Sequence, residues 1–147
     1  MIDDNPADQQ LVKAAVRGNT LDVELSFFLR AEDALDALQA GAPAWNPSPD
    51  LVLLDINLPG KTGFAVLEVL RSTSKCEDVR VVMFTSSKRS QDVMRAESLG
   101  ADGYVQKPTT LGEFFNAVIG AIRGDTGAFV AAKQSATLNH LEALPSW

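Results

Sequence analysis

The stretch Leu51-Val52-Leu53-Leu54-Asp55 joins four apolar residues directly to a carboxylate. Four apolar residues in a row are typical of a strand that is buried on both faces of a parallel sheet. A buried strand rarely ends on a charge without a partner, because an unpaired carboxylate is costly to bury. Open parallel sheets bind their ligands at the carboxyl ends of the strands. The stretch therefore predicts a parallel sheet with a functional carboxylate, Asp55, at its carboxyl edge.

Three other polar groups follow short apolar or strand-like segments in the same way. They are the Asp3-Asp4 pair, Thr85 after Val81-Val82-Met83-Phe84, and the Lys107-Pro108 pair. Alone, an Asp pair is usually a helix cap or solvated surface, a Thr is a strand residue, and a Lys is a surface charge. Together, carboxylates, a hydroxyl and an ammonium at one sheet edge can hold a divalent cation and a phosphoryl group. The ordered set favours the functional interpretation.

Apolar spacing, capping residues and Gly or Pro punctuation predict a regular alternation of helices and strands. The expected helices span residues 6–18, 31–40, 64–72, 90–99 and 111–123, and the expected strands span 23–29, 51–55, 79–85 and 103–106. Residues 41–50 contain three prolines and are expected to form a long loop. This alternation predicts the α/β class, with a parallel sheet, right-handed crossovers and helices on both faces.

Composition limits the classes of function. A chain of 147 residues is long enough for one domain with a substantial core. The net charge of −6 disfavours a nucleic-acid surface. With one cysteine, Cys76, and one histidine, His140, the chain offers neither a disulfide framework nor a Cys/His zinc site. Neither a membrane-spanning apolar stretch nor a signal peptide is evident, so we expect a cytoplasmic protein.

Residues 3–123 resemble the receiver domain of two-component response regulators. The matching stretches are Asp3-Asp4-Asn5, Leu53-Leu54-Asp55-Ile56-Asn57-Leu58-Pro59 with Gly63, Phe84-Thr85-Ser86, and Gly103-Tyr104-Val105-Gln106-Lys107-Pro108. The resemblance implies a flavodoxin-like, doubly wound, five-stranded parallel sheet of order 2-1-3-4-5. It also implies a receiver domain over residues 1–123, with residues 124–147 as a C-terminal tail and no separate output domain. The Asp-Asn-Pro-Ala-Asp start and the Pro-rich loop also resemble single-domain regulators that are paired with phytochrome-type kinases.

The same resemblance assigns the chemistry. Asp55 would accept a phosphoryl group from a sensor histidine kinase and form an acyl phosphate. A Mg²⁺ ion would be held by Asp4, by Asp3 through water, by Asp55 and by the main-chain carbonyl of Asn57. The protein would be a phosphoacceptor and not an enzyme, apart from Mg²⁺-dependent gain and loss of its own phosphoryl group.

Further roles follow from the resemblance for residues at the other strand ends. Thr85 and Lys107 would bind the phosphoryl oxygens, and Tyr104 would turn inward when Thr85 moves toward the phosphoryl group. A cis bond between Lys107 and Pro108 would aim the ammonium. Asn57 and Ser87 would flank the path of the water that hydrolyses the acyl phosphate.

The start of the chain departs from the family pattern, because only Met1 and Ile2 precede Asp3. We therefore expect a truncated first strand, since two residues cannot pair along both neighbouring strands. The apolar segment 127–132 is a candidate to fill the gap, although its alanines suit a helix better. The tail also carries apolar residues that could dock on the domain or on a partner, although a frayed tail is the simpler expectation; they are Leu138, Leu141, Leu144 and Trp147.

Output and alternative functions are open at this point. The apolar residues of the last helix exceed what one helix face buries, so a homodimer through the face of Tyr104 and that helix is one candidate output. A phosphate-ester hydrolase of the haloacid dehalogenase type also uses a strand-end Asp, but it usually has a second Asp where this chain has Asn57. A flavodoxin-like binding module without phosphorylation is the other alternative, although no phosphate-binding loop follows the first strand.

Overall fold

The computed structural model describes residues 1–125. Within this range the helices are α1 (Pro6–Gly18), α2 (Ala31–Gln39), α3 (Gly63–Ser72), η1 (Ser74–Cys76, a 3-10 helix), α4 (Ser90–Ser98) and α5 (Leu111–Arg123). The strands are β1 (Leu51–Leu54), β2 (Arg80–Thr85) and β3 (Gly103–Gln106). No helix among these residues combines the length and the apolar character that a membrane span needs. The predictions for segment 127–132 and for the apolar residues of the tail concern residues outside the described range.

The three strands form a parallel sheet in the order β1-β2-β3. Their register pairs Leu54 with Met83 and Met83 with Tyr104. Beyond β1 the sheet continues as two isolated parallel bridges, because Ile2 pairs with Leu54 on one side and with Phe28 on the other. The spatial order is therefore the Phe28 segment, the Ile2 segment, β1, β2 and β3. This is the order 2-1-3-4-5 of the expected fold, with its first two members each reduced to a single bridging residue.

The prediction of a full strand over residues 23–29 is wrong. In this segment only Phe28 forms a bridge, in which its amide donates to the carbonyl of Met1 and its carbonyl accepts from the amide of Asp3. Strand propensity in a sequence does not make a strand unless a neighbouring backbone is present to pair with. The short Met1–Asp3 segment provides pairing only around Phe28.

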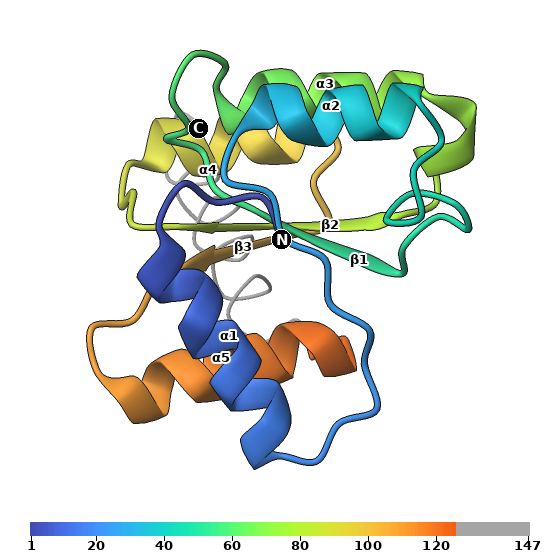
Figure 1. The fold of residues 1–147 in the computed structure, drawn as a ribbon. Coiled ribbons are helices and arrows are strands. Elements are labelled where there is room, and N and C mark those ends of the chain that lie inside the picture. Colours follow the sequence, from blue (N-terminus) through green and yellow to red (C-terminus); the bar gives the residue numbers. More distant parts are fainter. Residues whose placement is uncertain (126–147) are drawn as a thin grey trace, which may run out of the picture.

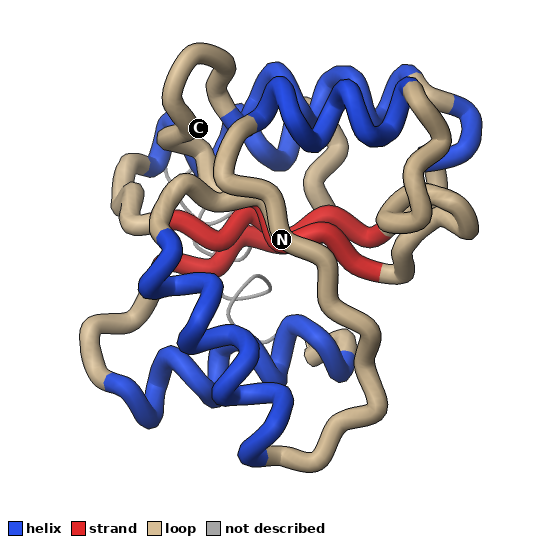
Figure 2. Tube along the Cα trace, viewed as in Figure 1, coloured by secondary structure: helices blue, strands red, loops and turns tan. Residues whose placement is uncertain are grey.

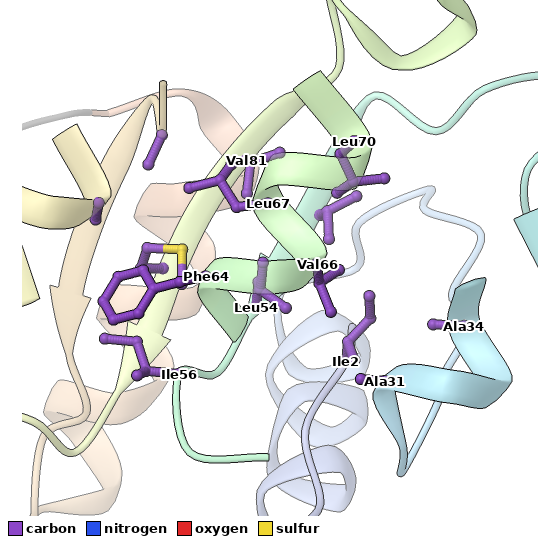
Figure 3. Packing of buried hydrophobic residues seen from close by; sticks show 14 of the residues in the cluster. Ile2, Ala31, Ala34, Leu54, Ile56, Phe64, Val66, Leu67, Leu70 and Val81 are labelled. Carbon is purple, nitrogen blue, oxygen red and sulfur yellow. The ribbon is translucent and has the colours of Figure 1, made fainter. Parts of the chain in front are cut away.

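Helices cover both faces of the sheet, as Figures 1 and 2 show. Helices α1 and α5 lie together on one face, and α2, α3 and α4 lie on the other (Figure 1). Two clusters of apolar side chains fill the space between the helices and the two faces of the sheet. One contains Phe84, Phe114 and Val118, with the two aromatic rings edge to face at 5.2 Å between centroids. The other surrounds Ile2, Leu54 and Leu67 (Figure 3).

The predicted helix boundaries are confirmed where a capping signal is present. Asn5 caps α1 through its side chain, which accepts a hydrogen bond from the amide of Ala7 at 3.0 Å. Helix α5 begins at the Thr110 cap and ends before Gly124, which adopts a left-handed conformation with φ of 81°. Caps of this kind fix the ends of helices by satisfying backbone groups that the helix itself leaves unpaired.

The loop before β1 contributes to the core more than its composition suggests. Trp45 is buried in the larger apolar cluster and stacks on Phe28 with 6.5 Å between ring centroids. A Trp buries a large apolar surface, so this contact fixes the long loop against the Phe28 segment.

Candidate functional site

Polar side chains from four places in the sequence meet at the carboxyl edge of the sheet. Asp55 directly follows β1, Thr85 is the last residue of β2, and Lys107 directly follows β3. Asp3 directly follows Ile2, whose bridges extend the sheet, and so it also lies at the carboxyl end of its segment. The backbone holds this arrangement, because the amide of Lys107 donates to the carbonyl of Thr85 at 2.7 Å and that of Asp55 donates to the carbonyl of Ile2 at 3.0 Å. The predicted convergence at one sheet edge is present.

The ammonium of Lys107 is the electrostatic centre of the site. Its Nζ lies 2.7 Å from Oδ2 of Asp3 and 2.8 Å from Oδ2 of Asp8. It also donates a hydrogen bond to Oδ2 of Asp55 at 3.3 Å. The Lys107 side chain is only 9% exposed, so solvent screens these contacts weakly. Burial lowers the pKa of Lys107, but its hydrogen bonds to Asp3 and Asp8, together with the charges of Asp3 and Asp55, outweigh burial and raise that pKa.

Asp3 is the most deeply buried carboxylate of the site, with no exposed surface. Its Oδ1 accepts a hydrogen bond from the amide of Asn5 at 2.9 Å. Burial raises the pKa of the Asp3 carboxyl, while Lys107 and the amide of Asn5 act in the opposite direction. The group is thus held in a place that penalises its charge, which is typical of residues kept for function.

Three carboxylates form a cluster suited to a metal ion. Asp3, Asp4 and Asp55 each offer an oxygen, and these oxygens lie within 4.8 Å of one another. Asp4 is exposed while the other two are buried, so the cluster opens to solvent on one side. Carboxylate oxygens, with space for water on an open side, are the ligands that Mg²⁺ and other hard divalent cations prefer. The donor set therefore fits the expected ion.

The loop after β1 is built around the backbone of Asp55. The amide of Asn57 donates to Oδ1 of Asp55 at 3.4 Å, and the Asn57 side chain is exposed. Helix α3 begins so close to this loop that a Cβ at Gly63 would lie 2.0 Å from the carbonyl oxygen of Asp55. Gly63 is thus required by the close approach of two backbones at the site.

Thr85 and Tyr104 are linked through Ser87. Thr85 is fully buried, and its hydroxyl oxygen accepts a hydrogen bond from the amide of Ser87 at 3.3 Å. The hydroxyl of Tyr104 donates to the carbonyl of Ser87 at 3.1 Å, and its ring is buried. Burial is the main cause that raises the pKa of the Tyr104 phenol. The structure therefore has Tyr104 in an inward position, tied to the loop that follows Thr85.

The prediction of a cis bond before Pro108 is wrong for this structure. Among the described residues the cis peptide bond is Asn46-Pro47, in the loop before β1. Lys107 nevertheless reaches the acidic site, because its amide is fixed to Thr85 and its ammonium has three carboxylate partners. The ion pairs therefore position the Lys107 ammonium although the peptide bond between Lys107 and Pro108 is trans.

A family model of the response regulator receiver domain matches residues 1–119. The chain belongs to the response regulator receiver domain family. It is 33% identical over 139 residues to the DNA-binding regulator RpaA of Synechocystis sp., a match that covers 95% of this chain and 54% of RpaA. It is 32% identical over 121 residues to the response regulator Rcp1 of the same organism, and this match covers 82% of each chain. This chain thus spans about half the length of the first of these relatives.

Solved structures give the same result for the fold. The phosphorylated cyanobacterial phytochrome response regulator RcpA superimposes with a TM-score of 0.73 at 30% identity, covering 81% of this chain and 86% of that one. The Mn²⁺-bound form of Rcp1 superimposes with a TM-score of 0.73 at 32% identity, with the same coverage. The flavodoxin-like fold class is therefore confirmed, and the receiver domain is homologous to phosphoacceptor response regulators. Receiver domains of this kind hold a divalent metal ion in an acidic pocket.

Two residues of the receiver site were missed by the sequence reasoning. Asp8, in the first turn of α1, pairs with Lys107. Gln9 is buried, and its amide donates to the carbonyl of Asp3 at 3.0 Å and to that of Phe28 at 3.1 Å. An acidic residue in the first turn of a helix has an ordinary explanation in the helix dipole, so nothing in the pattern around Asp8 assigns it to the site. Gln9 carried no signal beyond its helical position.

Proposed function

We propose that this receiver domain accepts a phosphoryl group on Asp55 from a sensor histidine kinase and signals through the resulting change of conformation. The observation that supports this most directly is the ammonium of Lys107, buried between the carboxylates of Asp3, Asp8 and Asp55. Together with Asp4, which lies in the cluster with Asp3 and Asp55, the site holds four carboxylates and one ammonium and therefore carries excess negative charge. Such a site is costly in a resting protein, and it is suited to bind a cation and a phosphoryl group together.

Asp55 has the position that the nucleophile needs. Its Oδ1 is oriented by the amide of Asn57 and its Oδ2 by Lys107. In the reaction a carboxylate oxygen of Asp55 forms a bond to phosphorus while the bond from phosphorus to the kinase histidine breaks, and its electron pair returns to the imidazole nitrogen. The product is an acyl phosphate on Asp55.

Asp3, Asp4 and Asp55, with the main-chain carbonyl of Asn57, would hold the metal ion, which we propose is Mg²⁺. When bound, the ion offsets two negative charges and thereby lowers the repulsion between the carboxylates and the incoming phosphoryl oxygens. Lys107 is placed to pair with a phosphoryl oxygen, since its ammonium already lies against Asp55. Thr85, at the end of β2, would supply a hydroxyl donor, and its movement would release the amide of Ser87.

The signalling surface that we propose lies over β3 and α5. Phe114 is buried, whereas Leu111 is 57% exposed and Phe115 is half-buried. Met94 of α4 is also exposed, at 61%. Exposed apolar side chains of this kind are suited to a homodimer or to a protein partner. Sedimentation of the free and phosphorylated forms distinguishes these two cases.

The kinase partner that we propose is of the phytochrome type, because RcpA, a phytochrome response regulator, is among the similar structures. A cytoplasmic location would follow from such a partner. Phosphotransfer from candidate kinases in vitro tests the pairing: the cognate kinase should transfer its phosphoryl group much faster than unrelated kinases do.

The proposed phosphorylation is tested with acetyl phosphate and Mg²⁺, followed by intact mass measurement. Wild type should gain one phosphoryl group, and Asp55→Asn should gain none, because the amide is not a nucleophile toward phosphorus. Asp50→Asn is a matched control, since Asp50 is exposed and precedes β1 at the opposite end of the strand. Loss of labelling in both variants, or in neither, would argue against Asp55 as the acceptor.

A further inference from the structure

Ser87 is held at each of its polar groups. Its amide donates to the hydroxyl oxygen of Thr85 at 3.3 Å, and its carbonyl accepts from the hydroxyl of Tyr104 at 3.1 Å. Its own hydroxyl donates to Oδ2 of Asp92 at 2.5 Å and accepts from the amide of Arg89 at 3.3 Å. A single residue therefore joins the end of β2, the first turn of α4 and the ring on β3.

The contact between Ser87 and Asp92 is the strongest of these bonds. Its length of 2.5 Å is that of a charge-assisted O–H···O⁻ hydrogen bond, which is about twice as strong as a neutral one. Asp92 lies in the first turn of α4, where the helix dipole favours a negative charge. It is half-buried, so solvent competes only in part for its carboxylate.

The geometry carries the effect of Asp92 to Tyr104. With its hydroxyl fixed by Asp92 and its amide by Thr85, Ser87 has little freedom to rotate. Its carbonyl is consequently aimed at the Tyr104 hydroxyl, which holds the ring in the inward position. If Ser87 were released from α4, its carbonyl would turn more freely, and the Tyr104 hydroxyl would lose the acceptor that holds the ring inward.

We propose that Asp92 is a positioning residue that acts through the Ser87 hydroxyl to keep the ring of Tyr104 inward. It thereby couples the first turn of α4 to the loop that follows Thr85. This role rests on the proposed function, in which Thr85 moves and releases the amide of Ser87 when Asp55 is phosphorylated. In this role, Asp92 helps to set how readily the protein changes conformation when Asp55 is phosphorylated.

Tyr104 is suited to a direct test because it is the single tyrosine of the chain. Incorporation of 3-fluorotyrosine gives one ¹⁹F resonance, and its shift between H₂O and D₂O reports how far the ring is exposed to solvent. Asp92→Ala should lower the ratio of inward to outward ring positions by about tenfold, the order expected for loss of a charge-assisted hydrogen bond. Asp92→Asn, which keeps an acceptor oxygen without the charge, should give a smaller change.

Two comparisons separate this role from a general effect on helix stability. Ser87→Ala should expose the ring as Asp92→Ala does, and the double variant should add nothing to either single one. Glu113→Ala removes an exposed acidic residue from the first turn of α5 and is the matched control. It should leave the Tyr104 resonance unchanged. Far-UV circular dichroism establishes that each variant is folded.

An unchanged Tyr104 resonance in folded Asp92→Ala and Asp92→Asn would overturn the proposal. So would an effect of Asp92→Ala that persists in full when Ser87 is already alanine. Labelling of the wild type by acetyl phosphate is measured on the same preparations. A wild type that takes no label refutes the proposed function, whereas an unaltered ring in Asp92→Ala refutes the role of Asp92.

Discussion

Replacing Lys107 by Met should destabilise the protein strongly in the absence of metal. The substitution keeps most of the side chain's length and removes the ammonium that pairs with Asp3, Asp8 and Asp55. Asp3 has no exposed surface, so its carboxylate would be left buried and without a cation. Removing one partner of a buried ion pair costs about 3–5 kcal/mol.

Protonation of Asp3 limits that cost and makes it depend on pH. Starting from the ordinary Asp value of 3.8, taking up a proton costs about 1.4 kcal/mol per pH unit. The cost of protonating Asp3, which is the upper limit of the destabilisation, is therefore about 5 kcal/mol near pH ~7.5 and about 2 kcal/mol near pH ~5.5. The destabilisation by Lys107→Met should thus fall from about 3–5 kcal/mol to no more than about 2 kcal/mol when the pH falls between these values.

Urea unfolding followed by far-UV circular dichroism, in metal-free buffer at both pH values, measures this effect. Lys75→Met is the matched control, because Lys75 is exposed in η1 and should change the free energy of unfolding by less than about 0.5 kcal/mol. Addition of Mg²⁺ should restore part of the stability of Lys107→Met, since the acidic cluster regains a cation. A loss of stability no larger than that of the control would refute the ion-pair account of the site.

Three further predictions concern the same site. Asp4→Ala should weaken Mg²⁺ binding at least about tenfold by calorimetry, because loss of even an outer-shell partner usually costs about 10- to 100-fold. Unchanged affinity would remove Asp4 from the metal site. The pKa of Asp3 is raised in the folded state, so the contribution of Asp3 to the free energy of unfolding is present at low pH and is lost as the pH rises through that pKa. Metal-free Asp3→Asn should therefore lose less stability between about pH 4 and neutrality than wild type does. Gly63→Ala should lower the free energy of unfolding by about 1–3 kcal/mol, because the new Cβ would meet the carbonyl of Asp55. Gly112→Ala, in a helix with open space around it, should raise that free energy by up to about 1 kcal/mol. Equal effects of the two substitutions in urea unfolding would contradict the close approach at Gly63.

The sequence was most informative where a polar residue follows a buried strand. Asp55, Thr85 and Lys107 could be placed at one sheet edge because parallel strands end on the same side. Helix ends were also predictable, since caps such as Asn5 and Gly124 act locally. These features depend on short-range rules that a single sequence contains.

Features that depend on long-range pairing were not predictable. The segment 23–29 has strand propensity, but pairing with the short Met1–Asp3 segment yields only the Phe28 bridge. Asp8 joined the site only because the start of α1 lies beside the end of β3, a contact that no local pattern encodes. The cis bond expected at Pro108 came from resemblance alone, and the backbone of this chain places Lys107 without it.

The central claim, that Asp55 is the phosphoacceptor, is tested most directly by locating the phosphoryl group. After phosphorylation by acetyl phosphate or a histidine kinase, treatment with hydroxylamine converts an acyl phosphate into a hydroxamate that tandem mass spectrometry can assign to one residue. We predict a single hydroxamate, at Asp55, that is lost in Asp55→Asn. A hydroxamate at Asp3 or Asp4, or a stable phosphate ester at Thr85, would contradict the account.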